Sequence, residues 1–166
     1  TVPPPMRALD RIVQSWDTAK STSLDADWSV CTTWAVRENA YYLMNVYRAQ
    51  LVFPSLKRAA IDLKGRYKAH DVLIEDADSG TSLIQQLQRE GPFRPITIKP
   101  KGSKSERMAA QSAVIEAGKV LIPNSAPWID AFRLELMAFP SGKHDDQVDS
   151  LSQFLNWVEA RGPGMR

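Results

Sequence analysis

The sequence has few of the residues that build covalent cross-links or soft-metal centres. Its 166 residues include one cysteine, Cys31, and two histidines, His70 and His144. A single cysteine excludes a disulfide framework and a cysteine-based zinc site, and two histidines argue against a histidine-rich metal centre. Any bound metal would therefore be held by oxygen ligands, a donor set that suits magnesium or manganese.

The chain also lacks a long apolar segment and a strong charge of either sign. It has no run of 18 apolar residues and no signal peptide, so we expect a soluble, cytoplasmic protein that does not use a membrane. The formal net charge is only +2. This balance is compatible with a nucleic-acid partner without being evidence for one.

What the chain does contain is enough apolar material for one domain. Hydrophobic residues make up 43% of the sequence, an ordinary fraction for a globular core. Residues 1–5 (TVPPP) are typical of an interdomain linker and have no initiator methionine. We therefore expect a linker remnant at residues 1–9, one domain at residues 10–161 and a flexible tail at residues 162–166.

Apolar periodicity predicts three strands followed by alternating helices and strands. A clear period of two over residues 28–37 predicts a strand, and short connections to strands at residues 11–17 and 41–51 favour an antiparallel meander. Further strands are predicted at residues 72–74, 95–99 and 120–122. Helices are predicted at residues 54–68, 82–90, 105–117 and 125–138 and from residue 144 onward. This order predicts an α/β fold, with a mixed sheet flanked by helices on both faces.

Carboxylates stand at three places that such a sheet can bring together. Asp17 ends the first predicted strand, Glu75 ends the central strand, and Asp145, Asp146 and Asp149 open the last helix. Ligands of mixed α/β sheets collect beyond strand ends and near helix N-termini. Each acid also has a purely structural interpretation, as a turn residue or as favourable negative charge in a first helical turn.

Such a group of acids is unfavourable without positive partners. Two like charges about 4 Å apart repel by roughly 4 kcal/mol at an effective dielectric near 20. No lysine or arginine lies within two residues of Glu75, and only Lys143 adjoins the last group. Two divalent ions about 3.5–4 Å apart would neutralise the acids, one activating a water and the other stabilising a leaving 3′ oxygen. Among the helix acids we place Asp146 first as a ligand and Asp149 next.

A basic stretch, IKPKGSKSERM, precedes and enters one of the predicted helices. It is either a solvated loop or a surface that contacts DNA phosphates, and phosphate contacts carry no base code. The predicted DNA-binding residues are Lys99, Lys101, Lys104 and Arg107, together with Lys143 beside the last helix.

Four blocks resemble, in order and spacing, the C-terminal nuclease domain of tailed-bacteriophage terminase large subunits: WDTAKSTSLDADWSV, VLIEDADSG, the Lys/Arg loop before GKVLIP, and HDDQVDSLSQFLNWV. The resemblance covers roughly residues 10–160. It implies a ribonuclease-H-like fold and an endonuclease that uses two Mg²⁺ or Mn²⁺ ions to cut concatemeric double-stranded viral DNA in the host cytoplasm. It places Asp17, Glu75 and Asp146 at the catalytic positions, with Asp149 as the other matching acid and Asp145 beside them.

The same resemblance implies partners. They are double-stranded DNA, an N-terminal packaging ATPase domain of the same polypeptide, the terminase small subunit and the portal. The chain has no G-x-x-x-x-G-K-[ST] motif, so by itself it should not translocate DNA. Two alternatives stay open here. One is a Holliday-junction resolvase or transposase core on the same fold, and the other is a non-catalytic DNA-binding module whose acids only cap helices.

Overall fold

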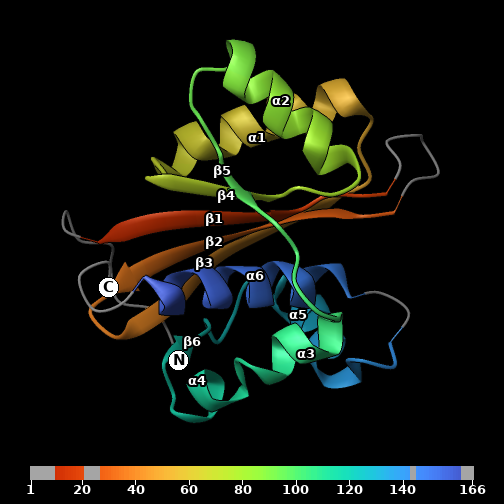
Figure 1. Ribbon diagram of the computed structural model, residues 1–166. Coiled ribbons are helices and arrows are strands. Elements are labelled where there is room, and N and C mark those ends of the chain that lie inside the picture. Colours follow the sequence, from red (N-terminus) through yellow and green to blue (C-terminus); the bar gives the residue numbers. More distant parts are fainter. Residues whose placement is uncertain (1–9, 21–26, 143–144, 162–166) are drawn as a thin grey trace.

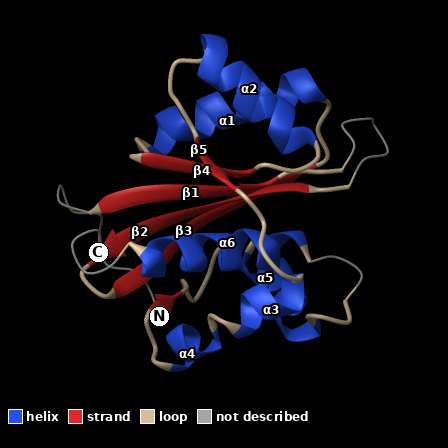
Figure 2. Ribbon diagram, in the orientation of Figure 1, coloured by secondary structure: helices blue, strands red, loops and turns tan. Residues whose placement is uncertain are grey.

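A six-stranded sheet separates two layers of helices in the computed structural model (Figures 1 and 2). The structure describes residues 10–20, 27–142 and 145–161. The predicted linker at residues 1–9, the predicted tail at residues 162–166 and the residues Lys143 and His144 lie outside the described residues. The strands are β1 (Arg11–Asp17), β2 (Ser29–Arg37), β3 (Ala40–Ala49), β4 (Asp71–Glu75), β5 (Ile96–Ile98) and β6 (Val120–Leu121). The helices are α1 (Phe53–Tyr67), α2 (Ser79–Glu90), α3 (Lys104–Ala109), α4 (Ser112–Glu116), α5 (Ile129–Ala138) and α6 (Asp146–Ala160).

The sheet is mixed, as the sequence predicts. Its strand order is β5-β4-β1-β2-β3-β6. Strands β1, β2 and β3 form the expected antiparallel meander. Strand β4 pairs with β1 in parallel, β5 with β4 in parallel, and β6 with β3 in parallel. Because Trp16 and Ile74 are register partners, the parallel strands β1 and β4 end side by side with Asp17 and Glu75.

Both faces of the sheet are covered, by α1 and α2 on one side and by α3 to α6 on the other (Figure 1). On the first side, Leu56 of α1 and Leu83 of α2 belong to a core cluster that includes Trp16. On the second side, Phe154 of α6 stacks on Trp34 with ring centroids 4.5 Å apart. Strand β2 is therefore buried along nearly its whole length. Its alternating side chains point into the two cores, one on each face of the sheet, and neither of the two faces is open to solvent.

Three predicted helices differ from those observed, and one of them, α2, begins at Ser79 rather than at Ser82. Residues 105–117 form two short helices instead of one, because the chain breaks at Gln111, whose side chain is buried and donates a 2.6 Å hydrogen bond to Asn156 of α6. Helix α5 begins at Ile129 rather than near Ser125. Pro127 disfavours helical backbone at Ala126, which excludes a start before the proline, and Trp128 is the N-cap residue.

In the part of the chain that the structure describes, none of the helices is both long enough and apolar enough to cross a membrane.

Candidate functional site

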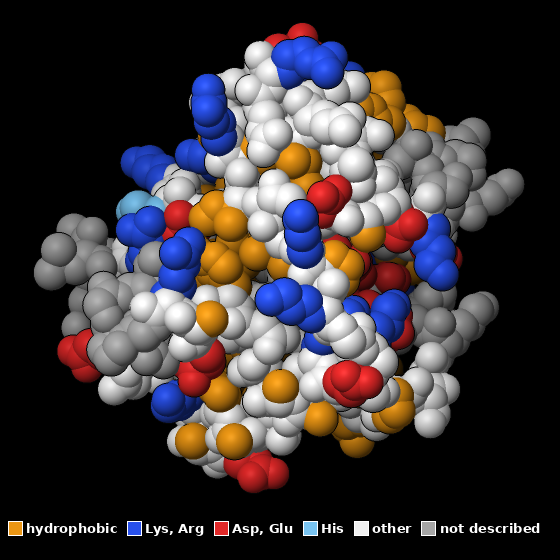
Figure 3. Space-filling view, in the orientation of Figure 1, with side chains coloured by type: hydrophobic (Ala, Val, Ile, Leu, Met, Phe, Trp, Pro, Cys, Tyr) orange, Lys and Arg blue, Asp and Glu red, His pale blue; other side chains and the backbone are white. Residues whose placement is uncertain are grey.

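The five predicted acids line one cavity. It measures about 320 Å³ and lies where β1 and β4 end and α6 begins. Asp17, Glu75, Asp145, Asp146 and Asp149 all contribute to its wall. On the face drawn in Figure 3, acidic side chains gather in a recess that is flanked by lysine and arginine side chains. Residues far apart in the sequence thus form one acidic site.

A hydrogen-bonded seam fixes α6 against β1. Ser15 Oγ donates to the carbonyl oxygen of Ser150 at 2.9 Å, and Ser150 Oγ donates to the carbonyl oxygen of Ser15 at 2.7 Å. The Gln153 amide donates to Ser15 Oγ at 2.9 Å and to the carbonyl oxygen of Trp16 at 3.1 Å. Buried polar groups are costly to leave unpaired. These bonds therefore set the position of α6 along the strand and bring Asp149 to the end of β1.

Asp17 is influenced by the negative charge of three other acids of the site. Burial raises its pKa well above the ordinary value, and the nearby carboxylates of Asp149, Asp146 and Glu75 raise it further, in that order. Lys104 acts in the opposite direction but more weakly than any of these. The ionised form of Asp17 is thus disfavoured in the folded protein unless positive charge enters the cavity.

The pKa values of three further acids are raised in the same direction. Burial is the first cause of a raised pKa at Glu75, Asp149 and Asp146, and for Asp146 the pKa rises to about 6. Several carboxylates with raised pKa values in one cavity are a common property of functional sites. Their shared oxygen chemistry is that of a site for a hard divalent cation.

One buried acid was missed by the sequence analysis. Glu135 of α5 is buried and faces the start of α6. Its carboxylate accepts from the backbone N–H of Val148 at 2.8 Å and from the side chain of Gln147 at 2.9 Å. It caps the helix that carries the acids, and after burial it is the next largest cause of the raised pKa of Asp146. The signal available in the sequence was its spacing of three from Phe132, which places it on the buried face of α5.

A lysine also enters the acidic cavity. Lys104, at the start of α3, lies 2.8 Å from an Asp149 carboxylate oxygen and 3.0 Å from one of Asp145. From the sequence, Lys104 is a predicted DNA-binding residue, and Lys143 is the only basic residue that adjoins these acids. The structure brings this partner from a different helix, whereas Lys143 lies outside the described residues.

The carboxylate oxygens of the cavity fit a divalent metal ion, but these side chains do not converge on a common point. Among the residues described, no group of three or more His, Cys, Asp or Glu side chains is arranged to hold a metal ion. The Lys104 ammonium is bonded to Asp145 and Asp149. It therefore turns two of the carboxylates toward itself, which partly explains why they do not converge with the others. A surplus of carboxylate over cation remains in the cavity, and the raised pKa of Asp17 reflects it.

The remaining basic candidates surround a second cavity. Lys99, Lys101 and Arg107 line a space of about 280 Å³ that shares Glu75 with the acidic cavity. Arg107 also donates a 2.9 Å hydrogen bond to the carbonyl oxygen of Gly102 and lowers the pKa of Glu75. The structure thus places these three residues directly beside the acids. Their contact with DNA stays a prediction.

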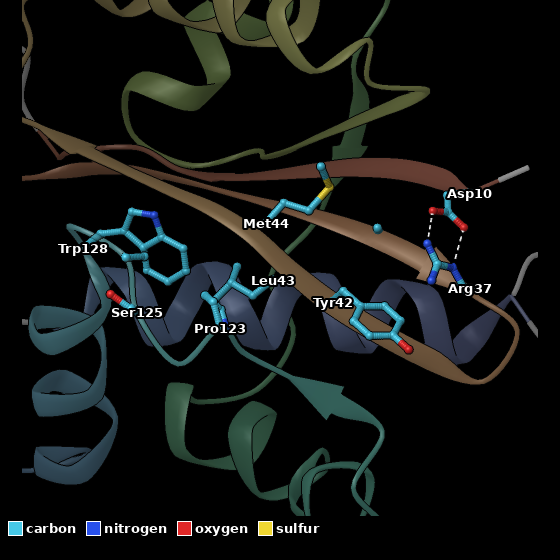
Figure 4. A pocket seen from close by; sticks show the side chains of 10 residues that line it. Asp10, Arg37, Tyr42, Leu43, Met44, Pro123, Ser125 and Trp128 are labelled. Atoms are coloured by element: carbon cyan, nitrogen blue, oxygen red, sulfur yellow. Dashed lines mark hydrogen bonds and ion pairs between the residues drawn. The ribbon is translucent and has the colours of Figure 1, made fainter. Parts of the chain in front are cut away.

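A third cavity, of about 280 Å³, contains none of the predicted site residues. Figure 4 shows Tyr42 and Met44 of β3, Trp128 from the segment before α5, and the Asp10–Arg37 ion pair around it. Arg37 Nε lies 2.7 Å from an Asp10 carboxylate oxygen. The one carboxylate in the wall of this cavity is therefore paired with an arginine. The third cavity lacks the surplus of acidic side chains that the cavity at Asp17 has.

The sheet order, the antiparallel meander and the helices on both faces define a ribonuclease-H-like fold. Residues 14–157 match the family described as the terminase RNaseH-like domain. The chain belongs to this family. No curated protein sequence matches the chain.

Solved structures of phage large terminases share the fold. The large terminase nuclease from thermophilic phage G20c with bound magnesium superposes with a TM-score of 0.72 and 18% identity, over 90% of this chain and 82% of that one. The Thermus phage P74-26 large terminase nuclease domain gives 0.67 and 19%, over 95% and 84%. A longer large terminase, from another thermophilic bacteriophage, gives 0.70 and 16%, over 95% of this chain and 42% of that one. The chain therefore spans less than half of that longer terminase.

Proposed function

We propose that this domain is a Mg²⁺- or Mn²⁺-dependent endonuclease that cuts double-stranded phage DNA during packaging. The observation that carries the proposal is the group of carboxylates from β1, β4 and α6 around one cavity, with too little positive charge to balance them. A magnesium-bound G20c nuclease of the same fold supports the choice of metal. Zinc- and cobalt-bound forms of that nuclease are also divalent complexes.

In this proposal, Asp17, Glu75 and Asp146 hold the metal, and Asp149 and Asp145 complete the acidic wall. Two bound divalent ions would supply an activated water and stabilise the leaving 3′ oxygen of the phosphodiester. Glu135 keeps the start of α6 in place by accepting from the Val148 N–H. The polar seam between Ser15 and Ser150 holds the helix acids at the end of β1.

DNA would lie across the basic edge of the site. Lys99, Lys101 and Arg107 stand next to Glu75, where they can contact phosphates on one side of the bond that is cut. Lys104 would join them when metal replaces it among the acids, and Lys143 is the fifth candidate. Contacts of this kind position DNA without reading its sequence.

The longer terminase polypeptide would add the other activities. We propose that an N-terminal packaging ATPase domain belongs to the same polypeptide, and that the terminase small subunit and the portal direct the domain to its DNA in the host cytoplasm. The longer thermophilic-phage terminase, of which this chain covers 42%, is solved with ADP and with ATP-γ-S. These complexes support an ATPase part outside the length matched here.

A plasmid-cleavage assay tests the function. The wild type should nick and linearise plasmid with Mg²⁺ or Mn²⁺ and lose this activity in chelator. Asp17→Asn should abolish cutting while the far-ultraviolet circular dichroism stays that of the wild type. Asp62→Asn removes an equivalent charge from an exposed position of α1 on the other side of the sheet, so this variant should cut normally. Full activity of Asp17→Asn would refute the assignment, and a preference for four-way junctions would favour a resolvase.

A further inference from the structure

The second cavity has the features of a nucleotide site rather than of a simple phosphate contact. Ile98 at the end of β5, Pro100 and Trp157 of α6 give it apolar walls, while Lys99 and Lys101 supply positive charge from the same loop. Nucleotide-binding surfaces combine these two properties, because a base needs an apolar or aromatic surface and its phosphate needs a cation. A surface that contacted phosphates alone would not need the apolar walls.

The size of the cavity limits what can enter. Its volume of about 280 Å³ is just below that of small-ligand pockets, which span roughly 300–1,000 Å³. A duplex cannot enter such a space, whereas one base with its sugar can. The cavity therefore fits a single nucleotide that has left the base stack.

The wall also offers a hydrogen-bond acceptor without a partner. The Gln153 side-chain amide is held by its nitrogen, which donates to Ser15 Oγ and to the carbonyl oxygen of Trp16. Its oxygen Oε1 is buried and has no hydrogen-bond partner among the residues that the structure describes. Gln153 is itself only 6% exposed and lines the cavity. An amino group of a base is a donor that would satisfy this oxygen once the Gln153 side chain or its neighbours move enough to expose it.

The location connects the cavity with the reaction. Glu75 belongs to the wall of both cavities, so a strand whose phosphate lies among the acids can place its neighbouring nucleotide beside Trp157. We propose that this second cavity binds one unpaired nucleotide of the DNA strand, next to the phosphate that is cut. This inference rests on the proposed function and adds to it a preference for DNA that is locally opened, because extruding a paired base costs free energy that an unpaired one does not.

Binding to two labelled duplexes, with Ca²⁺ in place of Mg²⁺, tests the inference, because a divalent ion has to balance the acids before a phosphate can lie among them. One duplex is fully paired and the other carries a single bulged 2-aminopurine. We expect the wild type to bind the bulged duplex at least about fivefold more tightly at equal salt, with a change in 2-aminopurine emission as the base leaves water. Equal affinity for the two duplexes, or unchanged emission on binding, would overturn the inference.

A variant that fills the cavity provides the control. Ile98→Phe adds bulk inside the cavity, whereas Ile96→Phe makes the same change two residues earlier on the same strand, outside the cavity wall. Ile98→Phe should lose the preference for the bulged duplex and the emission change, and Ile96→Phe should keep both. An Ile98→Phe protein with wild-type circular dichroism and an intact preference would refute the site. If metal-dependent plasmid cutting persists while the preference is absent, only the nucleotide site fails. If neither DNA binding nor cutting occurs, the proposed function fails with it.

Discussion

Removing the Lys104 ammonium should strengthen metal binding. Lys104 is bonded to Asp149 and Asp145 at 2.8 and 3.0 Å, so an incoming cation has to displace it from two carboxylates. The Lys104 side chain is 47% exposed, and ion pairs with this degree of solvent contact contribute about 0.2–1 kcal/mol each. The displacement therefore costs roughly 0.5–2 kcal/mol, which corresponds to about a 2- to 30-fold weaker Kd.

If Lys104 stays in the cavity instead, its charge should still weaken metal binding. An ammonium held about 5 Å from a doubly charged ion is repelled by roughly 1.7 kcal/mol even at the dielectric constant of water. Both routes predict that Lys104→Met binds Mn²⁺ more tightly than the wild type does. Without metal, the variant should be less stable, since the acids lose their bonded cation.

Titration of free Mn²⁺ by electron paramagnetic resonance measures this affinity without reference to cleavage. Lys101→Met is the matched control because it removes the same charge from the neighbouring loop without touching the acidic cavity. A gain in affinity for Lys104→Met that exceeds the gain for Lys101→Met supports the reasoning. Equal gains would show only a change in net charge, and a weaker Kd for Lys104→Met would refute the competition between lysine and metal.

Three further predictions concern the acids. Asp17→Asn should raise the Tm in chelator, because burial and three carboxylates raise the pKa of Asp17, and should lose the Tm increase that Mn²⁺ gives the wild type; an unchanged response to Mn²⁺ would contradict this. The pKa of Asp146, raised from 3.8 to about 6, makes its ionisation oppose folding above about pH 6 and leaves no penalty below about pH 4. Asp146→Asn should therefore stabilise the protein by about 1–2 kcal/mol at pH 7.5, less than the full shift implies because the residue is partly exposed, and the gain in urea unfolding should shrink between pH 6 and 4 rather than stay constant. Glu135→Ala should lower the free energy of unfolding by about 2 kcal/mol, since two buried hydrogen bonds at the start of α6 lose their acceptor, whereas Glu135→Gln should cost less; equal losses in the two variants would exclude a capping role.

The strands and the placement of the acids could be predicted because they depend on local pattern. Strand β1 was predicted at its observed bounds, since apolar residues and a terminal Asp17 mark it without reference to the rest of the fold. The run around residues 72–74 predicted β4, and a buried strand next to β1 brought Glu75 to the same edge. These are properties of short segments and of the rules by which parallel strands pair.

The partners of the acids could not be predicted because they come from distant segments. Lys104 lies 41 residues from Asp145, and sequence proximity pointed to Lys143 instead. Glu135 was not predicted as a site residue because a charged residue on a helix is ordinarily exposed. The break between α3 and α4 at Gln111 depends on a hydrogen bond to Asn156, 45 residues away, so the local sequence could not predict it. Long-range contacts decide such details.

The seam between Ser15 and Ser150 joins residues 135 positions apart, and this separation has a consequence for biosynthesis. A ribosome completes Asp17 and Glu75 long before it reaches the acids of α6. Until that last helix emerges and docks on β1, a nascent polypeptide carries only two sides of the site. If the domain is the nuclease proposed above, its site would be incomplete while most of the domain is being translated, and activity would begin only after α6 has docked on β1.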